Sequence, residues 1–183
     1  ASSTTVSGIG PPRRESRAGG AGTRRVRTTC GRIRPSESSE RPRVSRFPSM
    51  RASDLDGREY DLPGGLPAGP QVVLIASERW QQVLIEMWRA WLRRLERDVP
   101  LLGVWELALL PRVYAPARPL IDGGMRAGVA DPVARRRTLT AYVDLPRCAG
   151  ELGVAGFETV HAVLVGPDGD VVWTASGKPV AED

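Results

Sequence analysis

Cysteine and histidine are scarce in this chain, and long apolar runs are missing. Among 183 residues there are two cysteines and one histidine, too few for a disulfide-rich scaffold or for a metal site built on several histidines. No stretch approaches the roughly 18 consecutive apolar residues that a membrane-spanning helix needs. We therefore expect a soluble chain with no membrane span, no metal and no cofactor. The 41% of hydrophobic residues suffices for the core of one domain.

Charge is unevenly divided along the chain. Residues 1–50 contain eleven arginines, no lysine and three glutamates, a net charge of +8, whereas residues 51–183 contain 15 basic and 18 acidic side chains. The basic segment has almost no Leu, Ile or Phe, so it cannot offset the entropy lost in its own ordering. We predict a disordered basic arm rich in Arg, Ser and Gly over residues 1–52, and one folded domain over residues 53–183.

Three roles are open for the arm. Its Arg and Ser content suits an organelle transit peptide, although its glutamates and the lack of an amphipathic period count against this. Arginines could also neutralise nucleic-acid phosphates, but Phe47 is the only aromatic residue there to stack on a base. We favour a solvated extension, with Met50 as an alternative start of the protein. The expected location is the cytoplasm, or an organelle matrix if the arm is a transit peptide.

The first part of the domain predicts a strand, a helix and a second strand. Val72–Ala76 is an unbroken apolar run, typical of a strand buried on both faces. Apolar residues then recur at steps of three and four, which predicts an amphipathic helix of about 18 residues with Ser77 as its N-cap. This stripe, which we expect to face the core, consists of Trp80, Val83, Leu84, Met87, Trp88, Trp91, Leu92 and Leu95. Leu101–Leu110 predicts the second strand of a right-handed crossover.

Glycine and proline divide the other segments into shorter elements. Residues 54–62 predict a hairpin around Asp56-Gly57. Residues 117–129 look helical, but Gly123 and Gly124 predict that this helix is kinked or short.

The C-terminal third alternates between helix and strand. Asp131-Pro132 predicts a helix start, residues 138–144 a strand, and residues 145–152 a helix that ends at Gly153. Strands at residues 160–165 and 171–174 flank a tight turn and form an antiparallel hairpin. The predicted fold class is an α/β sandwich, a mixed central sheet of about five strands flanked by helices and closing with this hairpin.

The order of these segments resembles the thioredoxin-like superfamily, in its peroxiredoxin-like branch. The resemblance runs from about Asp54 to Gly177. It rests on the strand at residues 72–76 with its long Trp-bearing helix, and on Asp144, Leu152-Gly153-Val154, Thr159 and the run from Val163 to Trp173. The C-terminal end, from Val160 to Glu182, is also similar to the Atp10 family of ATP synthase assembly factors. The resemblance implies a thioredoxin-like sandwich.

The chain departs from this superfamily where its redox chemistry is located. Redox members carry a cysteine at the start of the first long helix, where the helix terminus stabilises a thiolate, but this chain has Ser77-Glu78-Arg79-Trp80. The resemblance also implies a cis-proline before the penultimate strand, and Val160 occupies that position. We therefore expect a redox-inactive protein that acts by binding a protein partner, as an assembly factor or accessory subunit does.

Cys148 is the only cysteine of the predicted domain. It lies near a helix start beside Arg147, which could lower the pKa of its thiol, and this would suit a thiol peroxidase or a thiol-disulfide oxidoreductase. It also shares a face with Leu145 and Leu152, and we favour an inert, packed cysteine.

The remaining candidate site residues are basic or polar. Arg135, Arg136 and Arg137 fall in the last turn of the helix that starts at Asp131, where cations complement the helix dipole. This run is either a solvated helix end, which we favour, or a site for an anion or an acidic partner. His161 is expected to be a hydrogen-bonded structural histidine rather than an acid or base. If the protein binds a partner, the candidate contacts are Arg126, Arg135, Arg136, Arg137, Thr159 and His161.

Overall fold

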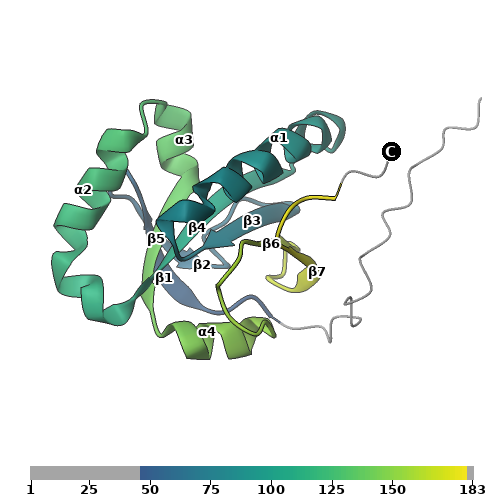
Figure 1. Cartoon of the computed structure of the whole chain (residues 1–183). Coiled ribbons are helices and arrows are strands. Elements are labelled where there is room, and N and C mark those ends of the chain that lie inside the picture. The colour runs from purple at the N-terminus through teal and green to yellow at the C-terminus, as the bar shows by residue number, and fades with distance from the viewer. Residues whose placement is uncertain (1–45, 181–183) are drawn as a thin grey trace, which may run out of the picture. The chain divides into compact units, whose positions relative to one another are not determined.

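Seven strands form one mixed sheet in the computed structural model, which describes residues 46–180 (Figure 1). The strands are β1 (Met50–Asp54), β2 (Glu59–Leu62), β3 (Gln71–Ala76), β4 (Gly103–Pro111), β5 (Thr138–Val143), β6 (His161–Val165) and β7 (Val171–Ser176). The α-helices are α1 (Gln82–Asp98), α2 (Arg118–Gly128), α3 (Pro132–Arg137) and α4 (Leu145–Leu152). Two 3₁₀ segments, η1 (Arg79–Gln81) and η2 (Arg112–Ala117), precede α1 and α2.

The sheet has the order β2-β1-β5-β4-β3-β6-β7. Its centre is the parallel set β3, β4 and β5, and β6 and β7 add the predicted antiparallel hairpin. The expected count of about five strands is too low because the N-terminal hairpin joins the same sheet. Its strand β1 pairs antiparallel with β2 on one side and with β5 on the other. In the pairing with β5, Ser53 lies opposite Thr140.

The core lies on both faces of the sheet. In β3, Val72 and Leu74 pack in the cluster that contains α1, whereas Val73 and Ile75 pack in the cluster that contains α4. This alternation is the two-residue period of a strand covered on both sides. Figure 1 shows α1 and α4 on opposite faces of the sheet.

Helix α1 is formed as predicted, but it buries a narrower stripe. Its buried residues are Leu84, Ile85, Trp88 and Leu92, and Trp91 and Leu95 are partly buried. Trp80, Val83 and Met87 belong to the predicted core-facing stripe, yet they are 58%, 58% and 40% exposed. The prediction was wrong for these three because steps of three and four trace a wider arc of the helix than one sheet face covers.

The predicted cap of α1 was also wrong. The hydroxyl of Ser77 donates to the carbonyl oxygen of Phe157, 3.0 Å away, and does not cap the helix. The 3₁₀ segment η1 lies between Ser77 and α1, and Glu78 and Gln81 form a capping box there. The 3₁₀ turn before α1 is therefore capped by Glu78, one residue after the predicted cap Ser77.

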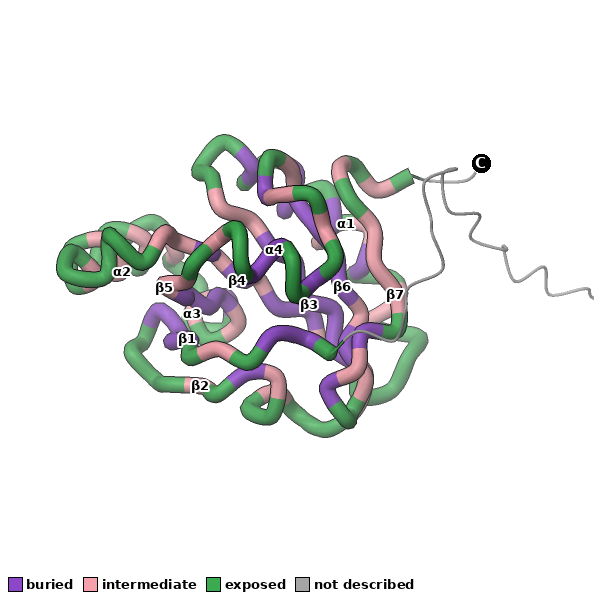
Figure 2. The backbone as a smooth tube through the Cα atoms, turned by 90° about the horizontal axis from the view of Figure 1, so that it is seen from below, coloured by how far each residue is buried: buried purple, intermediate pink, exposed green. Residues whose placement is uncertain are grey.

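Helix α2 is continuous, so the expected interruption at Gly123 and Gly124 is not found. It has no buried residue, and Figure 2 shows its backbone in the exposed and intermediate colours throughout. Arg118 donates to the hydroxyl of Ser53 (2.6 Å), and the hydroxyl of Tyr142 donates to Asp122 (3.0 Å). Polar tethers, rather than a buried stripe, attach α2 to the sheet.

The described fold begins before residue 53, the predicted start of the domain. Phe47 is 2% exposed and belongs to the cluster that contains α4, and its amide donates to the carbonyl oxygen of Gly169 (2.9 Å). The composition of residues 1–52 did not predict this contact, because a single aromatic residue, Phe47, attaches the end of the segment to the core. The rest of the expected arm, residues 1–45, lies outside the described residues. Within residues 46–180, no helix has the length and apolar content to cross a bilayer.

Candidate functional site

The end of β3 and the start of α1 form the position where the superfamily resemblance implies chemistry. Gln81 is 0% exposed there, and its side-chain amide donates to the carbonyl oxygen of Phe157 over 2.7 Å. Its side-chain oxygen accepts from the backbone amides of Ser77 (2.8 Å) and Glu78 (3.1 Å). Because the Ser77 hydroxyl donates to the same Phe157 oxygen, two side chains hold the loop before β6 against the start of α1.

His161 lies next to this junction, opposite Ile75 at the end of β3. Its Nε2 donates to the carbonyl oxygen of Gly156 (2.8 Å), since a carbonyl can only accept, and its ring contacts Phe157 edge-on. Burial lowers the pKa of His161 below its usual range, against weaker opposing effects of Gly156 and Glu158. The hydrogen-bonded histidine predicted from the sequence is therefore present, and its ring is neutral at neutral pH.

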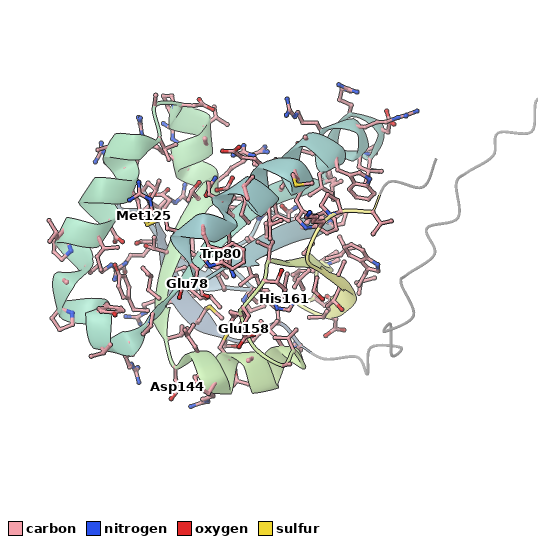
Figure 3. All side chains as sticks on the ribbon, in the orientation of Figure 1. Glu78, Trp80, Met125, Asp144, Glu158 and His161 are labelled. Atoms are coloured by element: carbon pink, nitrogen blue, oxygen red, sulfur yellow. The ribbon has the colours of Figure 1, made fainter. Side chains whose placement is uncertain are left out.

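Val160 and Thr159 complete this edge. Val160 is buried, and its carbonyl oxygen accepts from the amide of Gly177 (2.9 Å), so the expected cis-proline position is filled by a packed aliphatic residue. Thr159 is half-buried. In Figure 3, Glu78, Trp80, Glu158 and His161 lie at this end of the sheet. The side chains here can donate and accept hydrogen bonds, but none is a thiol.

Cys148 lies in α4, on the other face of the sheet from α1, with its side chain buried beside Ala149 and Leu152 in the core cluster. Burial, and to a lesser extent Glu151, raises the pKa of the Cys148 thiol to about 11. Arg147 does not counter this, because its guanidinium is paired with Glu151 (2.8 Å). Cys148 contributes to the wall of a hollow of about 330 Å³, but its thiol is protonated at physiological pH.

Three of the predicted arginines gather around one carboxylate. Arg126, Arg135 and Arg136 approach Asp56 of the β1–β2 turn to within 3.5, 3.0 and 4.0 Å. Arg137 is paired with Glu96 of α1 (2.9 Å). These ion pairs therefore join α2 and α3 to the β1–β2 turn, and α3 to α1. The positive charges of three arginines are balanced there by one partly exposed carboxylate, Asp56.

The structure does not bring all the predicted partner contacts to one surface. Thr159 and His161 lie where β3 ends, whereas Arg135, Arg136 and Arg137 directly precede β5. Because β3, β4 and β5 are parallel, the end of one strand and the beginning of another lie at opposite edges of the sheet. The two groups of candidates therefore belong to two separate surfaces.

Two features of this site were not predicted from the sequence, the burial of Gln81 and the exposure of Trp80. Gln81 stands among charged and polar residues at the start of a helix, where nothing in the pattern marks it as buried. Trp80 fits the apolar period, which indicates burial rather than exposure. Within residues 46–180, no group of three His, Cys, Asp or Glu side chains is arranged to hold a metal ion.

Comparison with known proteins identifies the fold. No protein-family model matches the sequence, and no curated protein matches it. Among solved structures, BsSco of the Sco family of cytochrome c oxidase assembly proteins aligns with a TM-score of 0.50 and 13% identity, over 74% of this chain and 85% of that one. A protein from Aquifex aeolicus VF5, assigned to electron transport, aligns with a TM-score of 0.53 and 14% identity, over 74% of this chain and 89% of its own.

These alignments, together with the strand order, confirm the predicted fold. The chain has a thioredoxin-like fold, with the N-terminal hairpin as an addition to the predicted five strands. The similarity of the C-terminal end to the Atp10 family stays a prediction.

Proposed function

We propose that this protein has lost thiol redox chemistry and works by binding a partner protein, as an assembly factor or accessory subunit. The observation that supports this most directly is the identity of the side chains at the junction between β3 and α1. Ser77 and Gln81 fill that position, and both side chains are engaged by the carbonyl oxygen of Phe157. Such fixed, uncharged groups stabilise a loop but do not exchange disulfides.

The protonated state of Cys148 supports the same proposal. A thiol peroxidase or a disulfide oxidoreductase needs an accessible thiolate, and the Cys148 thiol is buried with a pKa raised to about 11. The alternative enzymatic role of Cys148 therefore has no support from its surroundings. The assembly part of the proposal agrees with BsSco, which shares the fold and belongs to a family of assembly proteins, although BsSco itself contains a disulfide switch.

Turnover assays test the proposal. The purified full chain should reduce insulin disulfides, and consume hydrogen peroxide with a thiol donor, no faster than its Cys148→Ser variant. A thioredoxin and a peroxiredoxin assayed in parallel would show that the conditions support catalysis. Turnover by the full chain that Cys148→Ser abolishes would overturn the proposal.

Reactivity of the thiol provides a second measurement. In a Cys30→Ser background, we expect Cys148 of the folded protein to react with a disulfide reagent at pH 8 about 100-fold more slowly than in the urea-unfolded chain, because its thiolate fraction falls with the raised pKa. The rate should increase as the pH approaches 11. Equal rates in the folded and unfolded chains would contradict this.

A further inference from the structure

The outward side of α1 carries an unusual line of exposed side chains. Trp80, in the 3₁₀ segment η1 that leads into α1, is followed at steps of three and four by Val83 and Met87 of α1, and all three face solvent. Steps of this size keep residues on one side of a helix. The same line continues through three further exposed residues, Ala90, Arg94 and Arg97. It is about 26 Å long at 1.5 Å per residue.

The two halves of this line differ in chemistry. The first half exposes an indole and two aliphatic side chains, which is uncommon on a surface that contacts only water. The second half is mainly basic, because it exposes Arg93, Arg94 and Arg97 against one exposed carboxylate, Asp98, at the end of the helix. Among residues 46–180, other arginines of the helices are paired with carboxylates. Arg93, Arg94 and Arg97 form no such pair within this range. Glu96 is held by Arg137 of α3.

We propose that the outward line of α1, from Trp80 to Arg97, is a docking surface for an acidic amphipathic segment of a partner protein. The partner's apolar side chains pack on Trp80, Val83 and Met87, and its carboxylates face Arg93, Arg94 and Arg97. Tryptophan and arginine are the residues that most often dominate binding energy at interfaces. This inference rests on the proposed function and names the surface and the chemistry of the partner.

Charge excludes the chain's own N-terminal arm as the occupant. Residues 1–50 have a net charge of +8, so the arginine half of the line repels them. A second copy fits poorly as well, because a two-fold related α1 laid antiparallel would place its arginines on the apolar half. A membrane surface is disfavoured because the larger apolar face of α1, with Leu84, Trp88 and Leu92, is already buried in the core.

Selection from a peptide library tests this inference. A random 16-residue peptide library displayed on phage is selected on the full chain and counter-selected on its Val83→Glu variant. The enriched peptides should combine large apolar residues with three or more carboxylates. Their binding should weaken at least tenfold with Val83→Glu and with the double change Arg94→Glu and Arg97→Glu, and it should weaken further as salt is added.

Matched controls separate docking from general surface effects. Val172→Glu changes a valine of β7 that is also 58% exposed, and Arg51→Glu changes an exposed arginine of β1. Both should leave peptide binding within twofold. All variants should retain the cooperative unfolding transition of the parent chain, which shows that the losses arise at the surface.

Several outcomes would overturn the inference. These are enrichment of peptides without an acidic bias, equal binding to Val83→Glu and Val172→Glu, and no enrichment at all. A concentration-dependent dimer that Val83→Glu abolishes would assign the line to a second copy. Binding to phosphatidylglycerol vesicles that Val83→Glu abolishes would assign it to a membrane. Thiol turnover would refute the proposed function separately, since peptide selection does not depend on Cys148.

Discussion

Gln81 forms three hydrogen bonds at the start of α1, and nothing in the sequence predicts them. Its buried side chain satisfies two backbone amides nearby and the carbonyl oxygen of Phe157, which lies 76 residues further along the chain. A buried carboxamide with all its partners in place stabilises a structure chiefly because its removal leaves those partners unsatisfied.

Replacement of Gln81 by alanine should therefore destabilise the protein strongly. We expect the free energy of unfolding to fall by about 2 to 4 kcal/mol, since the amides of Ser77 and Glu78 lose their partner and the Phe157 carbonyl loses one of its two donors. Urea unfolding followed by circular dichroism measures this. Gln82→Ala, at the exposed neighbouring position, should change stability by less than about 0.5 kcal/mol. Similar losses in the two variants would refute the assigned role of Gln81.

His161 should make stability depend on pH. Its pKa is lowered in the folded protein from a usual value of 6.5, so the unfolded chain binds the proton more readily. The contribution is fully present above the unfolded-state pKa of 6.5 and is lost as the pH falls through the lower pKa of the folded protein. Urea titrations at pH 7, 6 and 5 should show this decline, and His161→Gln should reduce it. As the only histidine, His161 also has a unique imidazole NMR signal, and a pKa at or above 6.5 would contradict the prediction.

Among the elements, α4 shows most clearly how local signals determine a boundary. Asp144 accepts from the amide of Arg147 at its start (3.0 Å), and Gly153 ends it in a left-handed conformation with φ of 71°. The stop at Gly153 was predicted from the sequence, and the cap at Asp144 is the matching device at the other end of the helix. Helix α4 therefore has the bounds expected from the sequence.

Replacing either of two glycines of this segment by alanine should change the free energy of unfolding, in opposite directions. Gly153→Ala should lower the free energy of unfolding by about 1 kcal/mol, because a side chain disfavours the left-handed conformation. Gly150→Ala lies inside α4 with open space around the added carbon, and it should raise stability by about 0.5 to 1 kcal/mol. Thermal unfolding of both variants compares them directly. A destabilised Gly150→Ala, or an unchanged Gly153→Ala, would contradict the assigned end of α4.

Elements with strong local signals were predicted well, and the site was predicted only in part. The strand at residues 72–76, the helix after it and the final hairpin follow from period and turn residues. The exposure of Trp80 and the burial of Gln81 do not, because Trp80 lies beyond the face that the sheet covers and Gln81 is held by Phe157 of a distant loop. The position of Arg135 at the opposite edge from His161 likewise depends on strand direction, which is set by pairing between distant segments.

At the scale of the whole molecule, the segment before β1 is part of the fold. Phe47 is buried, and Arg46 forms a β-bridge with Asp170. A chain that begins at Met50 lacks both contacts. Its free energy of unfolding should be about 3 kcal/mol lower than that of a chain that begins at Arg46, a loss typical of a deleted core aromatic residue.

Urea unfolding of the two truncated chains measures this difference, and Phe47→Ala in the longer chain should reproduce most of it. Equal stability of the two truncated chains would show that the core does not need Phe47.

The central place of β3 has a consequence for the order of folding during synthesis. Its parallel neighbour β4 follows directly after α1 in the chain. Its other neighbour, β6, begins 86 residues after Ile75, the residue that pairs with His161. A nascent chain therefore exposes one edge of this apolar strand until β6 has left the ribosome. Chaperones that bind extended apolar segments should recognise this chain while it is being translated, and release it once β6 emerges.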